Sequence, residues 1–349
     1  MAGVNSAHRD AVVGLDLDRL GAWLSAAIPG AGTRVTATLI TGGRSNLTYL
    51  VSDGRGEWIV RRPPLGHVLA SAHDMGREYR VMTALCDTPI PVPRTFGSCD
   101  DPGVVGAPFY VMERVEGTSY HSAAELEALG ADRTRTISTR LVETLGALHR
   151  VVPGDVGLAD FGRPEGYLAR QVARWKKQLD GSRTRDLPDA DELHSRLAAD
   201  VLAESGVGIV HGDFRLDNML ILDDQVTAVL DWEMATLGDP LSDLALMLVY
   251  KRFGVGASIG PDPRTAASGA PGFVSESEII ELYCAITDCD LTRFGFYLGL
   301  AAYKLAAVLE GIHYRYLQGQ TVGEGFDRAG LLVPDLLEAG LEALKDDRG

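Results

Sequence analysis

Apolar and polar residues alternate along the first third of the chain, which is the pattern of strands with one buried face. Four stretches have this pattern: residues 35–40, 47–52, 57–61 and 109–114. A glycine-containing turn, residues 53–56, joins two of them in the manner of a hairpin. Helical spacing predicts two helices in this part, one over residues 16–28 and one from a capping box at residues 71–74 to about Leu85. We therefore expect a small sheet with few helices.

From residue 122 onward, apolar residues recur every three or four positions, which predicts a mainly helical part. Short strands are expected only around residues 209–231. The segment 253–273, rich in Gly, Pro, Ala and Ser, is interpreted as a connector or as a mobile loop beside a binding site. The predicted helices span residues 123–130, 132–150, 164–180, 189–205, 239–252, 276–288, 290–318 and 326–346.

The composition is that of a globular protein large enough for two lobes, with 349 residues of which 46% are hydrophobic. The longest apolar helix carries Lys304 and Glu310, so we expect no membrane span. No signal peptide is visible, and a cytoplasmic protein is expected. The four cysteines lack metal-binding spacing and are interpreted as reduced thiols.

The net charge of −15 disfavours nucleic-acid binding, because a phosphate backbone requires a basic surface. An anionic substrate would have to be bound by a local basic cluster. The chain has 28 arginines but only five lysines, and no lysine precedes Lys176. Any cationic group acting on phosphates in the first part of the chain must therefore be an arginine.

Residues 209–231 carry the most specific pattern in the chain: His211-Gly-Asp213, then Asn218, then Asp231 after a second apolar run. Phosphoryl transfer to a hydroxyl group uses one carboxylate to orient the hydroxyl, and an amide and a second carboxylate to hold Mg²⁺. The His-x-Asp-x-x-x-x-Asn spacing is that of the protein-kinase catalytic loop. Each part of the pattern is weak alone, but the combination favours phosphotransfer.

The run "HGDFRLDNMLI…AVLDWEMATLGDPLSDLALM" resembles the aminoglycoside phosphotransferase-like family of small-molecule kinases, in particular the branch that also occurs fused to acyl-CoA dehydrogenases. The resemblance extends from about Val35 onward. It implies an α+β, protein-kinase-like bilobal fold with a small antiparallel-sheet N-lobe and a larger, mainly helical C-lobe. We place the N-lobe at residues 1–115, with a loose tail at 1–14, and the C-lobe at residues 116–349.

For catalysis, the resemblance implies that Asp213 orients and deprotonates the acceptor hydroxyl, while Asn218 and Asp231 bind Mg²⁺. His211 is expected to brace the loop by hydrogen bonds, and Arg215 to balance the acidic cluster. Asp239 and Asp243 are expected to be structural. Asp239 is predicted to cap a helix that continues with Pro240, and Asp243, by the resemblance, to anchor the catalytic loop.

For the nucleotide, Gly43 and Ser45 lie in a turn that could approach phosphates. Glu113 and Val115 correspond to the hinge that would bind the base. A carboxylate at position 78 falls among the core positions of its helix and needs a partner.

The kinase resemblance makes Glu78 the helix glutamate that pairs with a strand cation. Aligning Trp58-Ile-Val-Arg61 on the kinase strand pattern selects Arg61, and Arg62 then faces the other way. The alternative for Glu78 is a position at the helix edge, paired with Arg77 or Arg80.

The expected activity is Mg²⁺-dependent transfer from ATP or GTP to a hydroxyl of a small molecule, either a hydroxyacyl-CoA or a hydroxy acid. An aminoglycoside acceptor is the alternative within the same class, and a non-catalytic nucleotide-binding protein is the alternative outside it. The chain is expected to act as a monomer or homodimer without nucleic-acid or membrane partners.

Overall fold

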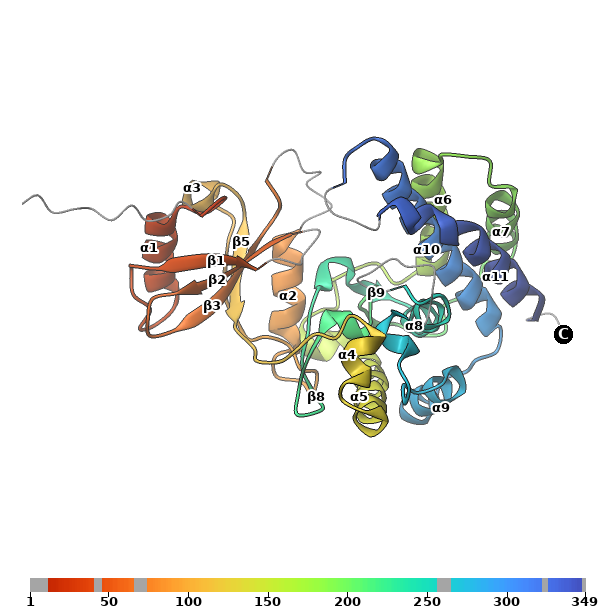
Figure 1. Ribbon diagram of the computed structural model, residues 1–349, viewed down its shortest axis with the longest axis horizontal. Coiled ribbons are helices and arrows are strands. Elements are labelled where there is room, and N and C mark those ends of the chain that lie inside the picture. Colours follow the sequence, from red (N-terminus) through yellow and green to blue (C-terminus); the bar gives the residue numbers. More distant parts are fainter. Residues whose placement is uncertain (1–11, 41–45, 66–73, 256–264, 322–325, 347–349) are drawn as a thin grey trace, which may run out of the picture. The chain divides into compact units, whose positions relative to one another are not determined.

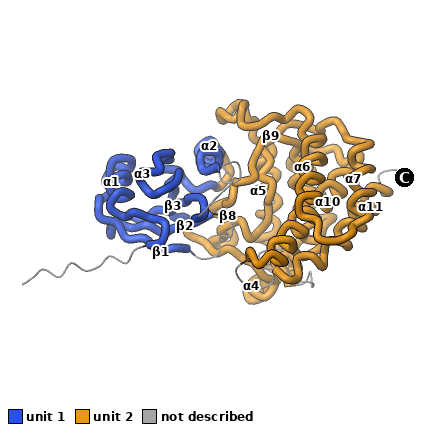
Figure 2. The backbone as a smooth tube through the Cα atoms, turned by 90° about the horizontal axis from the view of Figure 1, so that it is seen from above, with its two compact units in different colours: residues 1–86, 92–115 blue, residues 87–91, 116–349 orange. Residues whose placement is uncertain are grey.

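The structure is a computed structural model, and it describes residues 12–40, 46–65, 74–255, 265–321 and 326–346. The chain forms two compact units, residues 1–86 with 92–115 and residues 87–91 with 116–349 (Figure 2). Residues 87–91 belong to the second unit, not to the N-terminal lobe as predicted. Within that unit the Val229 N–H donates to the Pro91 carbonyl, which connects this segment to strand β8 (Gln225–Val229).

The first unit is an antiparallel sheet with helices (Figure 1). Its strands lie in the order β1-β2-β3-β5-β4. The elements are α1 (Leu17–Ala27), β1 (Thr36–Ile40), β2 (Leu47–Ser52), β3 (Glu57–Arg62), α2 (Met75–Leu85), β4 (Thr95–Cys99), α3 (Pro102–Val105) and β5 (Phe109–Glu113).

Strand alternation determines which residues form the core of this unit. Tyr49 and Val51 of β2, Val60 of β3 and Val111 of β5 are fully buried and pack in one cluster with Leu20 of α1. The opposite alternate positions of β3 and β5 face the other way, and Arg61 pairs in register with Tyr110 there. This second face receives the buried helix residue Glu78, as described below.

Two predictions for this unit need correction. Helix α2 begins at Met75 with Asp74 as its N-cap, because the Asp74 carboxylate accepts the Arg77 N–H; the predicted box began at Ser71, outside the described residues. Within the predicted loose tail, residues 12–14 are held in place. The Val13 carbonyl accepts a hydrogen bond from Tyr49, and the Gly14 carbonyl accepts one from Arg62.

The second unit is mainly helical, with two small antiparallel ribbons, β6-β9 and β7-β8. Its elements are α4 (Ala123–Glu127), α5 (Ala131–His149), η1 (Pro153–Val156), α6 (Tyr167–Ser182), α7 (Pro188–Ala199), β6 (Gly208–Val210), η2 (Leu216–Asn218), β7 (Met219–Leu222), β8 (Gln225–Val229), η3 (Trp232–Met234), β9 (Thr236–Gly238), α8 (Leu241–Phe253), η5 (Ala267–Gly269), α9 (Glu276–Thr287), α10 (Phe294–Leu317), η6 (Phe326–Leu332) and α11 (Val333–Asp346).

Helix α10 is the central helix of this unit and packs against α6, α7, α8 and α11. By length and hydropathy alone it could cross a membrane, but 67% of its apolar stretch is buried inside the protein. It begins at Phe294 instead of residue 290, because Arg293 adopts a left-handed conformation. A long apolar helix that is mostly buried is typical of the core helix of a folded domain.

Other boundaries differ from the sequence prediction. Helix α7 ends at Ala199, six residues before the predicted end. Helix α8 begins at Leu241, with Pro240 and not Asp239 as its N-cap residue. Asp239 precedes the cap, and its carboxylate accepts the Leu241 N–H at 3.1 Å. The predicted helix over residues 326–346 starts as the 3₁₀ segment η6.

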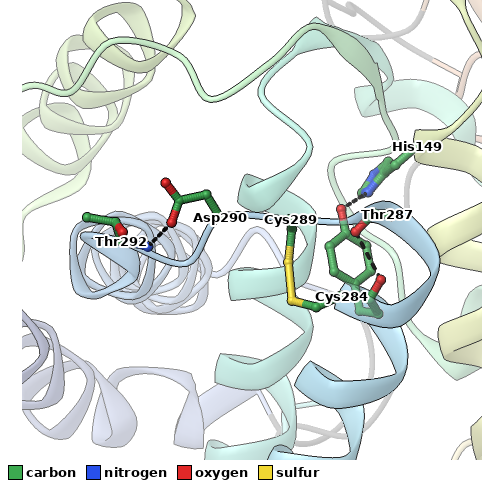
Figure 3. The surroundings of a disulfide bond; sticks show 7 residues. His149, Cys284, Thr287, Cys289, Asp290 and Thr292 are labelled. Atoms are coloured by element: carbon green, nitrogen blue, oxygen red, sulfur yellow. Dashed lines mark hydrogen bonds between the residues drawn. A yellow bond between two sulfur atoms is a disulfide. The ribbon is translucent and has the colours of Figure 1, made fainter.

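Two of the four cysteines, Cys284 and Cys289, form a disulfide, so the prediction of reduced thiols is wrong for this pair (Figure 3). Cys284 lies in the last turn of α9, and Asp288 ends that helix in a left-handed conformation. The chain then reverses and brings the two Cα atoms within 5.0 Å. Cys86 and Cys99 are free thiols.

Candidate active site

Strand β6 leads directly into the His211-Gly212-Asp213 segment, which is anchored from α8. The buried Asp243 carboxylate accepts the His211 N–H at 2.6 Å and the Gly212 N–H at 2.8 Å. Burial raises the pKa of Asp243, but hydrogen bonding and charge from His149 outweigh it and hold the pKa below its usual value. Asp243 is therefore an ionised anchor for two successive backbone amides.

Gly212 meets a local steric requirement at this bend. Its φ is +85°, a conformation that L side chains rarely adopt, and a Cβ there would lie 2.9 Å from the Met234 Cβ. The loop can pass this close to η3 only with glycine at this position.

His211 uses both ring nitrogens inside the protein, as its bracing role predicts. Its Nε2 lies 2.9 Å from the Leu230 carbonyl, and its Nδ1 accepts the Asp213 N–H at 3.2 Å. This pair of bonds specifies the tautomer with the proton on Nε2. The ring is fully buried against Trp232. His211 thus joins the catalytic loop to the residue that precedes Asp231.

Asp213 has three side-chain neighbours. Its Oδ1 accepts the Tyr250 hydroxyl, its Oδ2 accepts the Asn218 amide at 2.9 Å, and Arg215 Nε lies 3.4 Å from Oδ2. Burial raises the pKa of Asp213, but the Arg215 charge and the Tyr250 hydroxyl outweigh it, and the pKa lies below the usual value. The group is therefore a carboxylate at neutral pH, the form that a proton acceptor requires.

Arg215 is embedded among acidic and aromatic groups. It also lies 3.4 Å from the Asp217 carboxylate and stands over the Tyr250 ring. Burial lowers the pKa of Arg215, but Asp213 and Asp217 outweigh it, so the pKa is above its ordinary value. The guanidinium offsets the negative charge of this cluster, as predicted.

Asn218 and Asp231 flank the open end of the β7-β8 hairpin. Met219 pairs with Val229 in register, and the Leu230 N–H donates to the Asn218 carbonyl at 2.8 Å. Asp231 has φ +64°, an uncommon conformation for a non-glycine residue that is often found at functional positions. The hairpin therefore brings the backbone of Asp231 close to that of Asn218, although twelve residues separate the two in the sequence.

This pair fits Mg²⁺ in its chemistry. The Asn218 amide nitrogen is bonded to Asp213, so its Oδ1 is the end that would face a cation. The described part of the chain has no group of three or more His, Cys, Asp or Glu side chains that could hold a metal. Mg²⁺ suits such a sparse site, since it keeps waters and binds through one or two protein ligands plus phosphates.

In the first unit, Glu78 is buried, and its partners among the described residues include Arg61, Tyr110 and Asn46. Arg61 Nε lies 3.2 Å from Glu78 Oε2, the Tyr110 hydroxyl donates to Oε2 at 2.8 Å, and the Asn46 amide donates to Oε1 at 3.0 Å. The ion pair predicted from sequence is thus present. Arg62 faces the other way and donates to the Gly14 and Val105 carbonyls.

The structure gives less information on the other residues predicted to bind the nucleotide. Gly43 and Ser45 lie outside the described residues. The Glu113 carboxylate accepts the Arg94 N–H at 3.3 Å at the exposed end of β5, and Val115 is the last residue of the first unit.

Several residues of these clusters were missed by sequence reasoning. Tyr250 lies seven positions after Asp243, two turns along α8, and that spacing could have suggested a shared face. Lys304 is a cation in an apolar helix, and its Nζ donates to the Gly212 carbonyl at 2.6 Å. Asn46 and Tyr110 gave no comparable sequence signal.

His149 extends the Asp243 anchor. Its Nε2 lies 3.3 Å from Asp243, and its Nδ1 lies 2.6 Å from the Tyr283 hydroxyl on α9, beside the disulfide (Figure 3). The loop is thereby connected to α5 and α9.

A pocket of about 40 Å³ lies next to Asp213 within the second unit. Tyr250 and Arg215 line the pocket and also contact Asp213. The pocket is lined by His121, Leu141, Arg215, Leu216, Asp217, Met247, Tyr250, Lys251, Val255, Ala266, Ala267, Ser268, Phe273 and Ile279. Basic groups and apolar side chains dominate this lining, and Asp217 is its one carboxylate among these residues.

Comparisons with known sequences identify the kind of protein that carries this arrangement. Residues 36–276 match the phosphotransferase enzyme family. Acyl-CoA dehydrogenase family member 11 from Gallus gallus is 34% identical over 309 residues, covering 87% of this chain and 40% of that protein. The chain spans less than half the length of the curated relatives that it matches.

Solved structures agree with the fold. A candidate aminoglycoside phosphotransferase from Ralstonia eutropha JMP134 is 30% identical with a TM-score of 0.82, covering 95% of this chain and 98% of that one. Aminoglycoside phosphotransferase APH(4)-Ia, in a ternary complex with AMP-PNP and hygromycin B, has a TM-score of 0.60 at 14% identity, covering 93% and 98%. The second likeness concerns the fold alone.

Proposed function

We propose that this chain, which belongs to the phosphotransferase enzyme family, transfers the γ-phosphate of ATP or GTP to the hydroxyl group of a hydroxyacyl-CoA or a related hydroxy acid. The family makes it a small-molecule phosphotransferase. The acceptor, the choice of nucleotide and the use of Mg²⁺ are the proposed parts, together with the residue roles that follow.

The observation that carries the proposal is the Asp213 carboxylate with a hydroxyl already hydrogen-bonded to it. The Tyr250 hydroxyl donates a hydrogen bond to Asp213 Oδ1, which supports the proposal that this carboxylate accepts a hydrogen bond from an acceptor hydroxyl. The low pKa keeps Asp213 ionised. We assign to Asp213 the orientation of the acceptor hydroxyl and the acceptance of its proton as the new O–P bond forms.

The other residues of the cluster support this step. Asn218 and Asp231 would hold Mg²⁺, which when bound offsets the charge of the phosphate oxygens. Arg215, between Asp213 and Asp217, would offset further negative charge. His211 and Asp243 keep the loop backbone in place. In the first unit, Arg61, oriented by Glu78, is proposed to bind phosphate.

The pocket beside Asp213 favours an acidic, partly apolar acceptor over a polycation. Lys251 supplies positive charge there, and the carboxylate of Asp217 already faces Arg215. Leu141, Met247 and Phe273 supply apolar surface. An aminoglycoside carries several positive charges and would need an acidic pocket. The relatives named acyl-CoA dehydrogenases point to an acyl group in the same way.

The test is a phosphate-transfer assay with ATP or GTP against hydroxy acids, hydroxyacyl-CoAs and hygromycin B. Phosphorylated product is detected by its mass shift and by ³¹P NMR. We expect product with an acidic acceptor, only with Mg²⁺, and none with Asp213→Asn. Product with hygromycin B alone would contradict the proposed acceptor class, and no product with any acceptor would contradict phosphotransfer to these compounds.

Lys251→Met sharpens this test because it removes a charge from the pocket without touching Asp213. We expect a higher KM for the acidic acceptor and an unchanged KM for ATP. Lys177→Met is the matched control, since Lys177 is exposed on α6. Equal KM values for the acceptor in both variants would remove Lys251 from the acceptor site.

A further inference from the structure

Lys304 is a partly buried cation with no part in the mechanism given above. It lies in the middle of the core helix α10, where its neighbours in the sequence are apolar. Its Nζ donates to the Gly212 carbonyl at 2.6 Å and stands 5.3 Å from the centre of the Trp175 ring on α6. A buried ammonium group is costly unless it is paired, so such a position requires a reason.

The Gly212 carbonyl belongs to the peptide group that joins Gly212 to Asp213. Lys304 holds the oxygen of this group, and His211 Nδ1 accepts its N–H, so both ends of the plane are fixed. The preceding amides are fixed by Asp243. Because this peptide plane carries the Asp213 Cα, its orientation determines where the carboxylate points.

We propose that Lys304 is a positioning residue of the phosphotransferase: its ammonium group holds the Gly212–Asp213 peptide plane in the orientation that directs the Asp213 carboxylate at the acceptor. The inference rests on the proposed function of Asp213. Lys304 lies on a core helix far from Asp213 in the sequence. It would act on the reaction through the loop backbone, without touching the substrate.

The charge of Lys304 is part of this role, because a charged donor makes a stronger hydrogen bond than a neutral one. Three charged groups face it: Asp243 from α8, Asp213 from the loop and Arg174 from α6. Burial lowers the pKa of Lys304 to about 8, although the two carboxylates raise it. The charge-assisted bond is therefore complete at neutral pH and is lost as the pH rises through about 8.

The first experiment measures kcat and KM between pH 6.5 and 9.5, using phosphate release from Mg-ATP with water as acceptor. In the wild type, kcat should fall above pH about 8. Lys304→Met should lower kcat at neutral pH by roughly 10²-fold, as expected for a misplaced reacting group, and leave KM for ATP unchanged. Lys177→Met is the matched control and should keep the wild-type profile.

Lys304→Arg is the conservative variant. It distinguishes a role of the positive charge in positioning the loop from a role of the side chain in packing. Its guanidinium stays protonated, so kcat should be retained above pH 8, where the wild type loses it. A fall of kcat at the same pH in Lys304→Arg would overturn the proposal, and so would a wild-type kcat in Lys304→Met.

A second measurement needs no folded variant and no turnover. The chain has only five lysines, so wild-type protein labelled with ¹³C at lysine Cε yields few signals to titrate. One lysine should titrate near pH 8, and the backbone amide signals of Gly212 and Asp213 should move with it. Amide signals that ignore this transition would overturn the coupling. If the amide signals follow the lysine titration but the enzyme transfers no phosphate, the proposed function is wrong, while the contact between Lys304 and the loop is confirmed.

Discussion

At the scale of single residues, Asp213 and Asp231 differ in their surroundings, and the same substitution should affect them differently. Asp213 has a low pKa and three side-chain partners, whereas Asp231 stands in a left-handed conformation next to the Asn218 backbone contact. In the proposed reaction, Asp213 accepts a proton and Asp231 holds the cation.

Asp213→Asn should lower kcat by about 10²–10⁴-fold, the usual size of a general-base contribution, and leave the affinity for ATP intact. Asp231→Asn should lower kcat and also weaken ATP binding in the presence of Mg²⁺, because a charged ligand is lost. Isothermal titration calorimetry and single-turnover assays measure both quantities. Equal nucleotide affinities in the two variants would contradict the assignment of metal binding to Asp231 and not to Asp213.

Lys304 should make stability and activity change in opposite directions with pH. Its folded-state pKa of about 8 is below the ordinary lysine value, so between the two values the unfolded chain binds more protons and stability rises with pH. The free energy of unfolding of Lys304→Met, relative to wild type, should therefore decrease from pH 8 to pH 10. Urea denaturation at intervals of one pH unit measures it, and a constant difference would contradict the lowered pKa.

At the scale of elements, strand alternation separates two adjacent arginines of β3. Arg61 pairs in register with Tyr110 and meets Glu78 of α2, while Arg62 lies on the opposite face and donates to backbone carbonyls. Neighbouring positions of one strand therefore serve a binding cluster and the packing of the unit.

Arg61→Ala should raise KM for ATP or lower kcat with little loss of melting temperature. Arg62→Ala should lower the melting temperature, because the carbonyls of Gly14 and of the buried Val105 lose their donor. Differential scanning fluorimetry and the phosphate-release assay make the comparison. If only Arg62→Ala loses turnover, and does so without losing stability, then Arg62 and not Arg61 acts on the nucleotide.

At the scale of the whole molecule, both compact units contribute to the proposed activity, the first through Arg61 and Glu78 and the second through the cluster around Asp213. A ligand that binds only the folded chain stabilises it according to its concentration relative to Kd. Saturating Mg²⁺ with ATP or GTP should therefore raise the melting temperature by several degrees, and nucleotide with EDTA should raise it less. Identical shifts with and without Mg²⁺ would contradict the Asn218/Asp231 site.

The sequence by itself determined what depends on local spacing. Alternation predicts β1, β2, β3 and β5 to within one terminal residue but not β4, and helical periodicity predicts the helices of the second unit. The resemblance of the long motif that starts at His211 indicates the phosphotransferase family. The kinase strand pattern selects Arg61 as the partner of Glu78, and alternation then places Arg62 on the opposite face, since side chains on a strand point to opposite sides.

Only the tertiary structure decided the contacts between residues far apart in the chain. Tyr250 and Lys304 reach the catalytic loop from α8 and α10, and Asn46 and Tyr110 complete the Glu78 cluster. These contacts depend on how helices and strands pack, and spacing within one element carries no information about the partner it meets. The Cys284–Cys289 disulfide has the same cause on a smaller scale, because the reversal at Asp288 brings the two cysteines together.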